Sequence, residues 1–166
     1  MKQLVGLVFA IASLPAIGAE PNAPAVFESL KTLAGDWHAT DKANATRVTW
    51  KVIANGTTLV ESWTMSPTRQ SMTVYTMDGE RLLATHYCPQ GNAPRMQLTR
   101  TDASGASHFL FVDGANLQDP AGAHEHAFWI RLDAAGTLTR SETYIRNDAT
   151  YDANADEGAA ETFTRD

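Results

Sequence analysis

Apolar and polar residues alternate along most of the chain beyond residue 45. Between Thr46 and Ala54 the large residues Val48, Trp50 and Val52 fall on every second position, with polar residues between them. A period of two is typical of a β-strand that buries one face. Ten such segments are predicted: near Trp37–Thr40, then Thr46–Ala54, Thr57–Met65, Ser71–Met77, Glu80–Cys88, Arg95–Thr101, Ser107–Asp113, His124–Leu132, Thr137–Ile145 and Ala159–Arg165.

Two turn pairs divide the early strands into hairpins. Asn55-Gly56 is the strongest short hairpin signal in the chain, because both residues tolerate the positive φ of a tight turn. A two-residue turn there places Trp50 opposite Glu61, so the Glu61 carboxylate is carried inward with the large side chains. Asp78-Gly79 predicts a second hairpin in the same way.

The second hairpin determines which side chains share a face with His86. A turn centred on Asp78-Gly79 pairs Tyr75 with Leu82 and leaves Tyr75 on the same side as His86. Neither face of this hairpin is clearly the more polar, so the direction of His86 stays open.

The predicted fold is all-β. Short strands joined in chain order by tight turns form an antiparallel meander, and a meander of ten strands removes its exposed edges by closing into a barrel. Apolar residues at helical spacing predict one short helix, Ala25–Ala34, that caps a barrel end. We therefore expect a ten-stranded antiparallel up-and-down barrel with one short N-terminal helix.

Two longer connections are rich in Gly, Asp and Asn. They span Gly114–Ala123 and Asn147–Gly158, and we expect both to be rim loops over a barrel mouth. The second is acidic, but it lacks the EF-hand spacing and closing Glu, so we interpret it as a solvated loop rather than a calcium loop.

The N-terminus has the pattern of a secretory signal. Lys2 is followed by the apolar run Leu4–Leu14, and residues 1–19 end in the small residues that a signal peptidase accepts. The run is shorter than the roughly 20 residues that span a bilayer, which argues against a stable membrane anchor. We expect cleavage after Ala19, a single barrel domain over residues 20–166, and a periplasmic or secreted location.

The charge of the chain limits which partners we expect, and its cysteine content limits which covalent links it can form. The chain has 13 basic and 19 acidic residues and a formal charge of −6, and loss of Lys2 with the signal makes it more negative. Nucleic acids and anionic membranes require clustered Lys and Arg, so we expect neither as a partner. A single cysteine, Cys88, cannot form an internal disulfide.

Several motifs resemble known barrel families. Gly35-Asp36-Trp37 is similar to the Gly-x-Trp that begins lipocalin barrels and to the equivalent segment of nitrobindin-like haem-binding barrels. The stretch Thr85–Met96, THYCPQGNAPRM, resembles the T-H-Y-C-x-x-G-N-x-P-R-M signature of a family of exported bacterial calycin-like proteins. The later Asn116–Pro120 and His124-Glu125-His126 also match that family. The resemblance, over residues 27 to 165, implies fold and export, but no reaction.

Two His-containing pairs suggest a metal site. His86 and Cys88 share one side of a strand, and His124 and His126 share one side of another, because alternate residues face the same way. If both pairs face the lumen, three imidazoles and a thiolate suit zinc or copper, and one His could hold haem. The alternative is a structural polar cluster in the barrel wall.

We expect a noncatalytic barrel that binds a small, largely apolar molecule, since no catalytic motif is recognisable. Arg95 could reach Glu61 or an acidic ligand group, or form a surface salt bridge, and Asp113 could face inward with Glu61. The competing functions are a metal- or haem-binding protein, with possible redox activity, and a barrel with a filled interior. The candidate ligand-binding residues are Trp37, Trp50, Glu61, Trp63, His86, Arg95, Phe109, Phe111, His124, His126 and Phe128.

Overall fold

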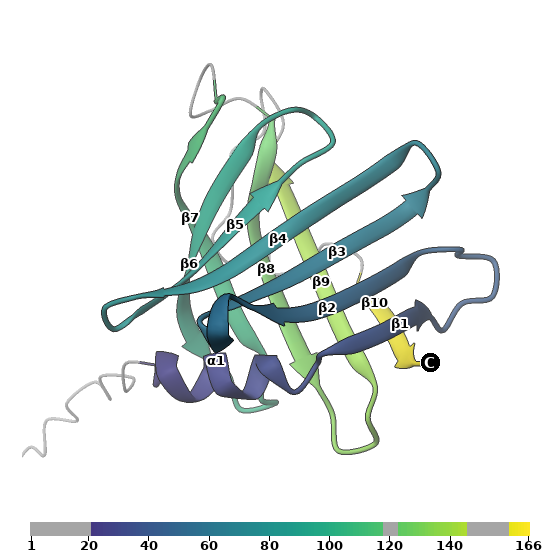
Figure 1. Cartoon of the computed structure of the whole chain (residues 1–166), viewed down its shortest axis with the longest axis horizontal. Helices are drawn as coiled ribbons and strands as arrows, with labels where there is room; N and C mark the ends of the chain where they lie inside the picture. The colour runs from purple at the N-terminus through teal and green to yellow at the C-terminus, as the bar shows by residue number, and fades with distance from the viewer. Residues whose placement is uncertain (1–20, 118–122, 146–159) are drawn as a thin grey trace, which may run out of the picture.

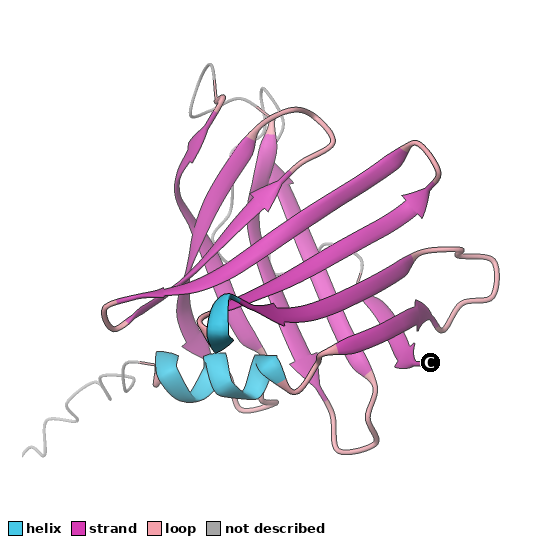
Figure 2. Cartoon of the chain, viewed as in Figure 1, coloured by secondary structure: helices cyan, strands magenta, loops and turns pink. Residues whose placement is uncertain are grey.

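The computed structural model describes residues 21–117, 123–145 and 160–166. These residues form one α-helix, a single 3₁₀ turn and ten β-strands (Figures 1 and 2). In chain order the elements are α1 (Ala23–Lys31), β1 (Gly35–Ala39), β2 (Arg47–Ile53), the 3₁₀ turn (Ala54–Gly56), β3 (Thr58–Ser66), β4 (Arg69–Asp78), β5 (Arg81–Tyr87), β6 (Ala93–Thr101), β7 (Ser107–Ala115), β8 (His124–Leu132), β9 (Leu138–Ile145) and β10 (Glu161–Arg165).

The ten strands close into one antiparallel barrel. Each strand pairs with its neighbours in the sequence, and β1 pairs with β10 to complete the ring. The closing register places Trp37 opposite Arg165 and Ala39 opposite Phe163. The prediction of an all-β, ten-stranded, calycin-like barrel with one short helix is confirmed.

The first hairpin has the expected register. Trp50 lies opposite Glu61 and Val52 opposite Leu59, and the turn places Asn55 at a φ of +54°. Glu61 is therefore carried to the inner face of the barrel, where it is fully buried. The alternation of β2 was sufficient to predict this.

The second hairpin differs from expectation by one turn position. Asp78 pairs with Arg81, so the turn residues are Gly79 and Glu80 rather than Asp78 and Gly79. Gly79 has a φ of +61°, the conformation that a type II′ turn requires at its first central residue. Tyr75 consequently lies opposite Ala84 instead of Leu82. The shift spans two residues of the partner strand, so every side chain keeps its predicted face.

One end of the barrel is packed solid and covered by α1. Phe27 and Leu30 of α1 are buried against the strands, and the helix begins two residues before the predicted boundary. The interior above it is filled by large side chains, each of which is at most 2% exposed: Trp37, Trp50, Leu59, Tyr75, Leu82, Met96, Phe109, Phe128, Ile130, Leu138 and Phe163. This packed half is the floor on which the other half of the lumen is built.

Some expectations lie outside the described residues. The predicted signal, residues 1–19, and most of the two predicted rim loops belong to the undescribed segments 1–20, 118–122 and 146–159. Among the residues that the structure does describe, no helix has the length and apolar character to cross a membrane.

Candidate functional site: a charged cluster beneath an open lumen

A cavity of about 1050 Å³ occupies the barrel end opposite α1. Helix α1 lies near the turn between β6 and β7, whereas the cavity is bordered by Cys88, Pro89 and Gln90, where β5 leads into β6. Its lining combines apolar, aromatic and charged side chains: Asn44, Thr46, Trp63, Met65, Arg69, Ser71, Cys88, Pro89, Gln90, Ala123, Arg140, Glu142, Tyr144, Ile145 and Glu161.

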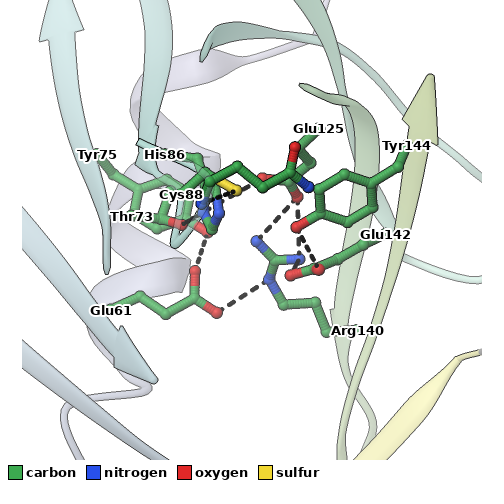
Figure 3. Close-up of polar contacts among 10 residues, drawn as sticks. Glu61, Thr73, Tyr75, His86, Cys88, Glu125, Arg140, Glu142 and Tyr144 are labelled. Atoms are coloured by element: carbon green, nitrogen blue, oxygen red, sulfur yellow. Dashed lines mark hydrogen bonds and ion pairs between the residues drawn. The ribbon is translucent and has the colours of Figure 1, made fainter. Parts of the chain in front are cut away.

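Arg140 lies at the bottom of this cavity and binds three carboxylates (Figure 3). Its Nε lies 2.9 Å from Oε1 of Glu61, and its Nη1 lies 2.7 Å from Oε1 of Glu142. Its Nη2 lies 3.4 Å from Oε1 of Glu125. Two aromatic rings flank the guanidinium carbon, with ring centroids at 4.3 Å for Phe128 and 5.4 Å for Trp63.

Strand β9 places the charged side chains at the cavity floor by simple alternation. Leu138, Arg140, Glu142 and Tyr144 occupy every second position, and the register sets Arg140 opposite Ile130 and Glu142 opposite Phe128 on β8. Leu138 belongs to the packed core, while the other three line the cavity. The inner face of β9 thus changes from apolar to polar along the barrel axis.

A β-bulge in β8 brings Glu125 into the same cluster. The register shifts between Glu125 and Ala127, so that Glu125 lies opposite Tyr144. Such a bulge adds one residue to a strand and redirects the side chains beyond it. Glu125 is fully buried, and its contacts with Arg140 and His86 place it inside the barrel.

The opposite wall contributes a row of hydrogen-bonding groups. The Tyr75 hydroxyl donates to Oε2 of Glu61 at 2.6 Å. Nδ1 of His86 lies 3.0 Å from the Thr73 hydroxyl and 3.2 Å from Oε2 of Glu125. His86 therefore links β5 to β4 on one side and to β8 on the other.

Burial shifts the protonation of this cluster. Loss of solvation raises the pKa of Glu61, and it raises the pKa of Glu125 well above its ordinary value, although Arg140 acts in the opposite direction on both. Burial lowers the pKa of His86 to about 4. His86 is consequently neutral near pH 7, and Glu125 keeps its proton to a higher pH than an exposed carboxyl group does. Perturbed ionisable groups beside a cavity are a general mark of a functional site.

The predicted ligand-binding residues divide between the cavity and the packed core. Trp63 lines the cavity, and Glu61 and His86 lie in the cluster beneath it. The remaining aromatic predictions lie in or against the packed core and do not line this cavity: Trp37, Trp50, Phe109, Phe111 and Phe128. These aromatic residues form the packed floor of the barrel, and other residues line the cavity above it.

The four predicted metal ligands do not converge. Nε2 of His124 lies 3.0 Å from Nδ1 of His126, and the Phe111 ring centroid lies 4.4 Å from the His124 ring and 5.4 Å from the His126 ring. Cys88 lines the cavity, whereas His86 contacts Thr73 and Glu125. Within the described ranges no three His, Cys, Asp or Glu side chains are placed to hold a metal ion. The expectation of one shared His and Cys centre is corrected accordingly.

Arg95 does not face the lumen. Its side chain is exposed and forms an ion pair with Asp113, which is exposed as well. The expectation that Arg95 is a polar group of the binding site was therefore wrong, as was the inward direction of Asp113. The surface salt bridge, left open as the alternative, is what the structure contains. The interior arginine is Arg140.

No family model matches the chain, and no curated protein matches it. The cavity and the charged cluster below it are accordingly the basis for a function.

Proposed function

We propose that this protein binds a small, largely apolar molecule in the open half of its lumen and releases it unchanged. The cavity of about 1050 Å³ is the observation that supports this most directly. Ligand pockets typically measure about 300 to 1,000 Å³ and are apolar with a few placed polar groups. Trp63, Met65, Pro89 and Ile145 provide apolar surface for the body of such a ligand, within a lining that contains more polar than apolar surface.

The width of the barrel also supports binding over a filled interior. Side chains fill the interior of an eight-stranded barrel, and diameter grows with strand number. Ten strands close this barrel, and its large core residues gather in the half next to α1. The open half therefore has room for a guest molecule.

The pairing of the charged groups supports binding without a reaction. The Arg140 guanidinium is occupied by three carboxylates, and Tyr75 donates to Glu61. Glu61, Glu125 and His86 are each 2% exposed or less and lie below the lining of the cavity. Acid and base catalysis needs a group within hydrogen-bond reach of the substrate, and these three do not line the site. Glu142, which does line it, is paired with Arg140 and accepts a hydrogen bond from Tyr144.

Binding in the lumen is tested by filling it. Ser71 lines the cavity and Gln70, its neighbour on β4, is exposed. The neutral fluorescent probe N-phenyl-1-naphthylamine should bind the wild type and the Gln70→Trp variant with equal affinity. The Ser71→Trp variant should bind it at least tenfold more weakly, because the indole occupies the cavity. Equal binding by all three proteins, or no binding by the wild type, would exclude the lumen as the site.

We also propose that the protein is exported and acts outside the cytoplasm. Support comes from the apolar run and small residues within residues 1–19 and from the resemblance of residues 85–96 to an exported family. Expression of the full chain in a bacterium should yield a periplasmic or secreted protein whose intact mass and N-terminal sequence begin at Glu20. A cytoplasmic protein that retains residues 1–19 would contradict export.

A further inference from the structure

We infer that the ligand of this cavity carries a positively charged nitrogen, held at the floor by Glu142 between the Trp63 and Tyr144 side chains. This inference rests on the proposed binding in the lumen and specifies the chemical class of the ligand. An organic amine or quaternary ammonium with an apolar body has the required chemistry.

The charge of the cluster is the first reason. Three carboxylates, Glu61, Glu125 and Glu142, surround the single guanidinium of Arg140. His86 is neutral near pH 7, since burial lowers its pKa to about 4, so it adds no positive charge. Three carboxyl groups thus surround one guanidinium in a low-dielectric interior, where a bound cation favours the ionised form of the carboxyl groups.

Arg140 is closed to an anionic ligand. Its side chain is 1% exposed, and Nε, Nη1 and Nη2 each face a carboxylate within 3.4 Å. Arg69, the other arginine of the lining, is exposed where β4 begins, and the acidic Glu161 borders the same cavity. At the floor itself, each side-chain nitrogen of Arg140 thus already faces a carboxylate and is not available to an acidic ligand.

Glu142 is the carboxylate within reach of the cavity. Its side chain is 29% exposed, whereas Glu61 and Glu125 are fully buried. The Tyr144 hydroxyl donates to Oε2 of Glu142 at 3.2 Å, which brings an aromatic ring beside the carboxylate (Figure 3). Trp63 lines the same floor and already has a guanidinium 5.4 Å from its ring. Aromatic rings together with a carboxylate are the groups that recognise ammonium ions.

Glu125 supplies an independent sign that positive charge is missing from the floor. It is fully buried, and its Oε2 accepts no hydrogen bond from any residue in the described segments. Nδ1 of His86 lies 3.2 Å from this oxygen, and the His86 ring is neutral near pH 7. Burial in this setting raises the pKa of Glu125, and a cation bound nearby would favour its ionised form.

Three ligands that differ only in their head group test the inference by isothermal titration calorimetry. Octyltrimethylammonium, 1-octanol and octyl sulfate share one apolar chain and carry positive, zero and negative charge. We expect the ammonium to bind roughly tenfold more tightly than the alcohol, and the sulfate to bind most weakly. The Glu142→Gln variant should lose the preference for the ammonium and keep its affinity for octanol. The Glu80→Gln variant, altered by the same charge in an exposed turn, should behave as the wild type.

The outcomes separate the two proposals. Equal affinity for ammonium and alcohol, or tighter binding of the sulfate, would overturn the cationic ligand while leaving binding in the lumen intact. A preference that survives in the Glu142→Gln variant would also overturn the assigned floor. Failure of all three ligands to bind would count against the proposed function itself.

Discussion

Arg140 is the residue on which the polar interior depends. Its guanidinium lies among Glu61, Glu125 and Glu142 and between the rings of Phe128 and Trp63. Three carboxylates at this depth repel one another unless a cation separates them, and the delocalised guanidinium can meet several of them at once. The packing of three strands, β3, β8 and β9, is therefore linked to one side chain.

Replacement of this side chain should destabilise the fold. We expect Arg140→Gln to lower the free energy of unfolding by about 3 to 5 kcal/mol, as measured by urea denaturation, because the carboxylates lose their common counter-charge. Arg81→Gln removes an exposed arginine that pairs with Asp78, and it should cost about 1 kcal/mol or less. Similar losses for the two variants would show that the cluster contributes little to stability.

Glu125 should give the stability a measurable pH dependence. Burial raises the pKa of Glu125 well above 4.5, so the folded state holds a proton that the unfolded state has lost above that pH. Stability from this group is therefore fully present below about pH 4.5 and declines as pH rises toward the folded pKa. The slope for a single proton is at most about 1.4 kcal/mol per pH unit.

A Glu125→Gln variant isolates this effect. Glutamine resembles the protonated acid and does not titrate, so the stability of the variant relative to the wild type should increase from pH 5 to pH 8. His86, whose pKa is lowered to about 4, makes the fold less stable as pH falls below about 6.5, but it is present in both proteins. A difference that stays constant over this pH range, in denaturation curves of the two proteins, would contradict the raised pKa of Glu125.

The junction between α1 and β1 shows how an element boundary is fixed. Gly35 has a φ of +133°, and a Cβ at this position would lie 2.8 Å from Nη1 of Arg165. Arg165 donates to the carbonyl oxygens of Thr32 and Ala34 at the helix end, and its guanidinium lies 4.5 Å from the Trp37 ring centroid. The last strand thereby ties the end of the helix to the start of the first strand.

A methyl group at this junction should be costly. We expect Gly35→Ala to lower the free energy of unfolding by about 2 to 3 kcal/mol, because it combines backbone strain with displacement of Arg165. Gly136→Ala is the matched control, since Gly136 has a φ of +84° and open space around it. This control adds backbone strain without any steric clash, and its free energy of unfolding should fall by about 1 kcal/mol. Equal midpoints of thermal unfolding in the two variants would contradict the role of Arg165.

Sequence periodicity predicted the elements well and their irregularities poorly. All ten strands could be predicted because alternation is visible over part of each of them, and the register of β2 with β3 followed from Asn55-Gly56. The turn at Gly79 was misplaced by one position, since Asp78-Gly79 and Gly79-Glu80 both satisfy the turn chemistry. Alternation is insensitive to this choice, which is why the faces were still correct.

The candidate site was predicted only where no bulge intervenes. Glu61 follows an uninterrupted strand and was placed inward correctly. The bulge next to Glu125 breaks the period of two, so the pattern His-Glu-His on β8 drew attention to the histidines rather than to the glutamate between them. Arg140, Glu142 and Tyr144 alternate along β9 and were detectable in the sequence, but charged residues at such positions usually indicate a solvated face.

At the scale of the whole molecule, the barrel has two unlike halves. The half next to α1 is packed with aromatic and aliphatic side chains, and the other half contains a cavity of about 1050 Å³ over the cluster around Arg140. The only cysteine, Cys88, is buried, so no internal disulfide supports the walls. The walls of the cavity are therefore supported by the packed half of the barrel and by the hydrogen bonds between its strands.

A crystal structure of the complex with octyltrimethylammonium tests this account most directly. We predict one molecule inside the barrel, with its nitrogen beside Glu142 and within about 6 Å of the Trp63 or Tyr144 ring centroid, and with its chain directed toward Met65 and Ile145. A molecule bound on the outer surface of the barrel, with the lumen unoccupied, would contradict the account.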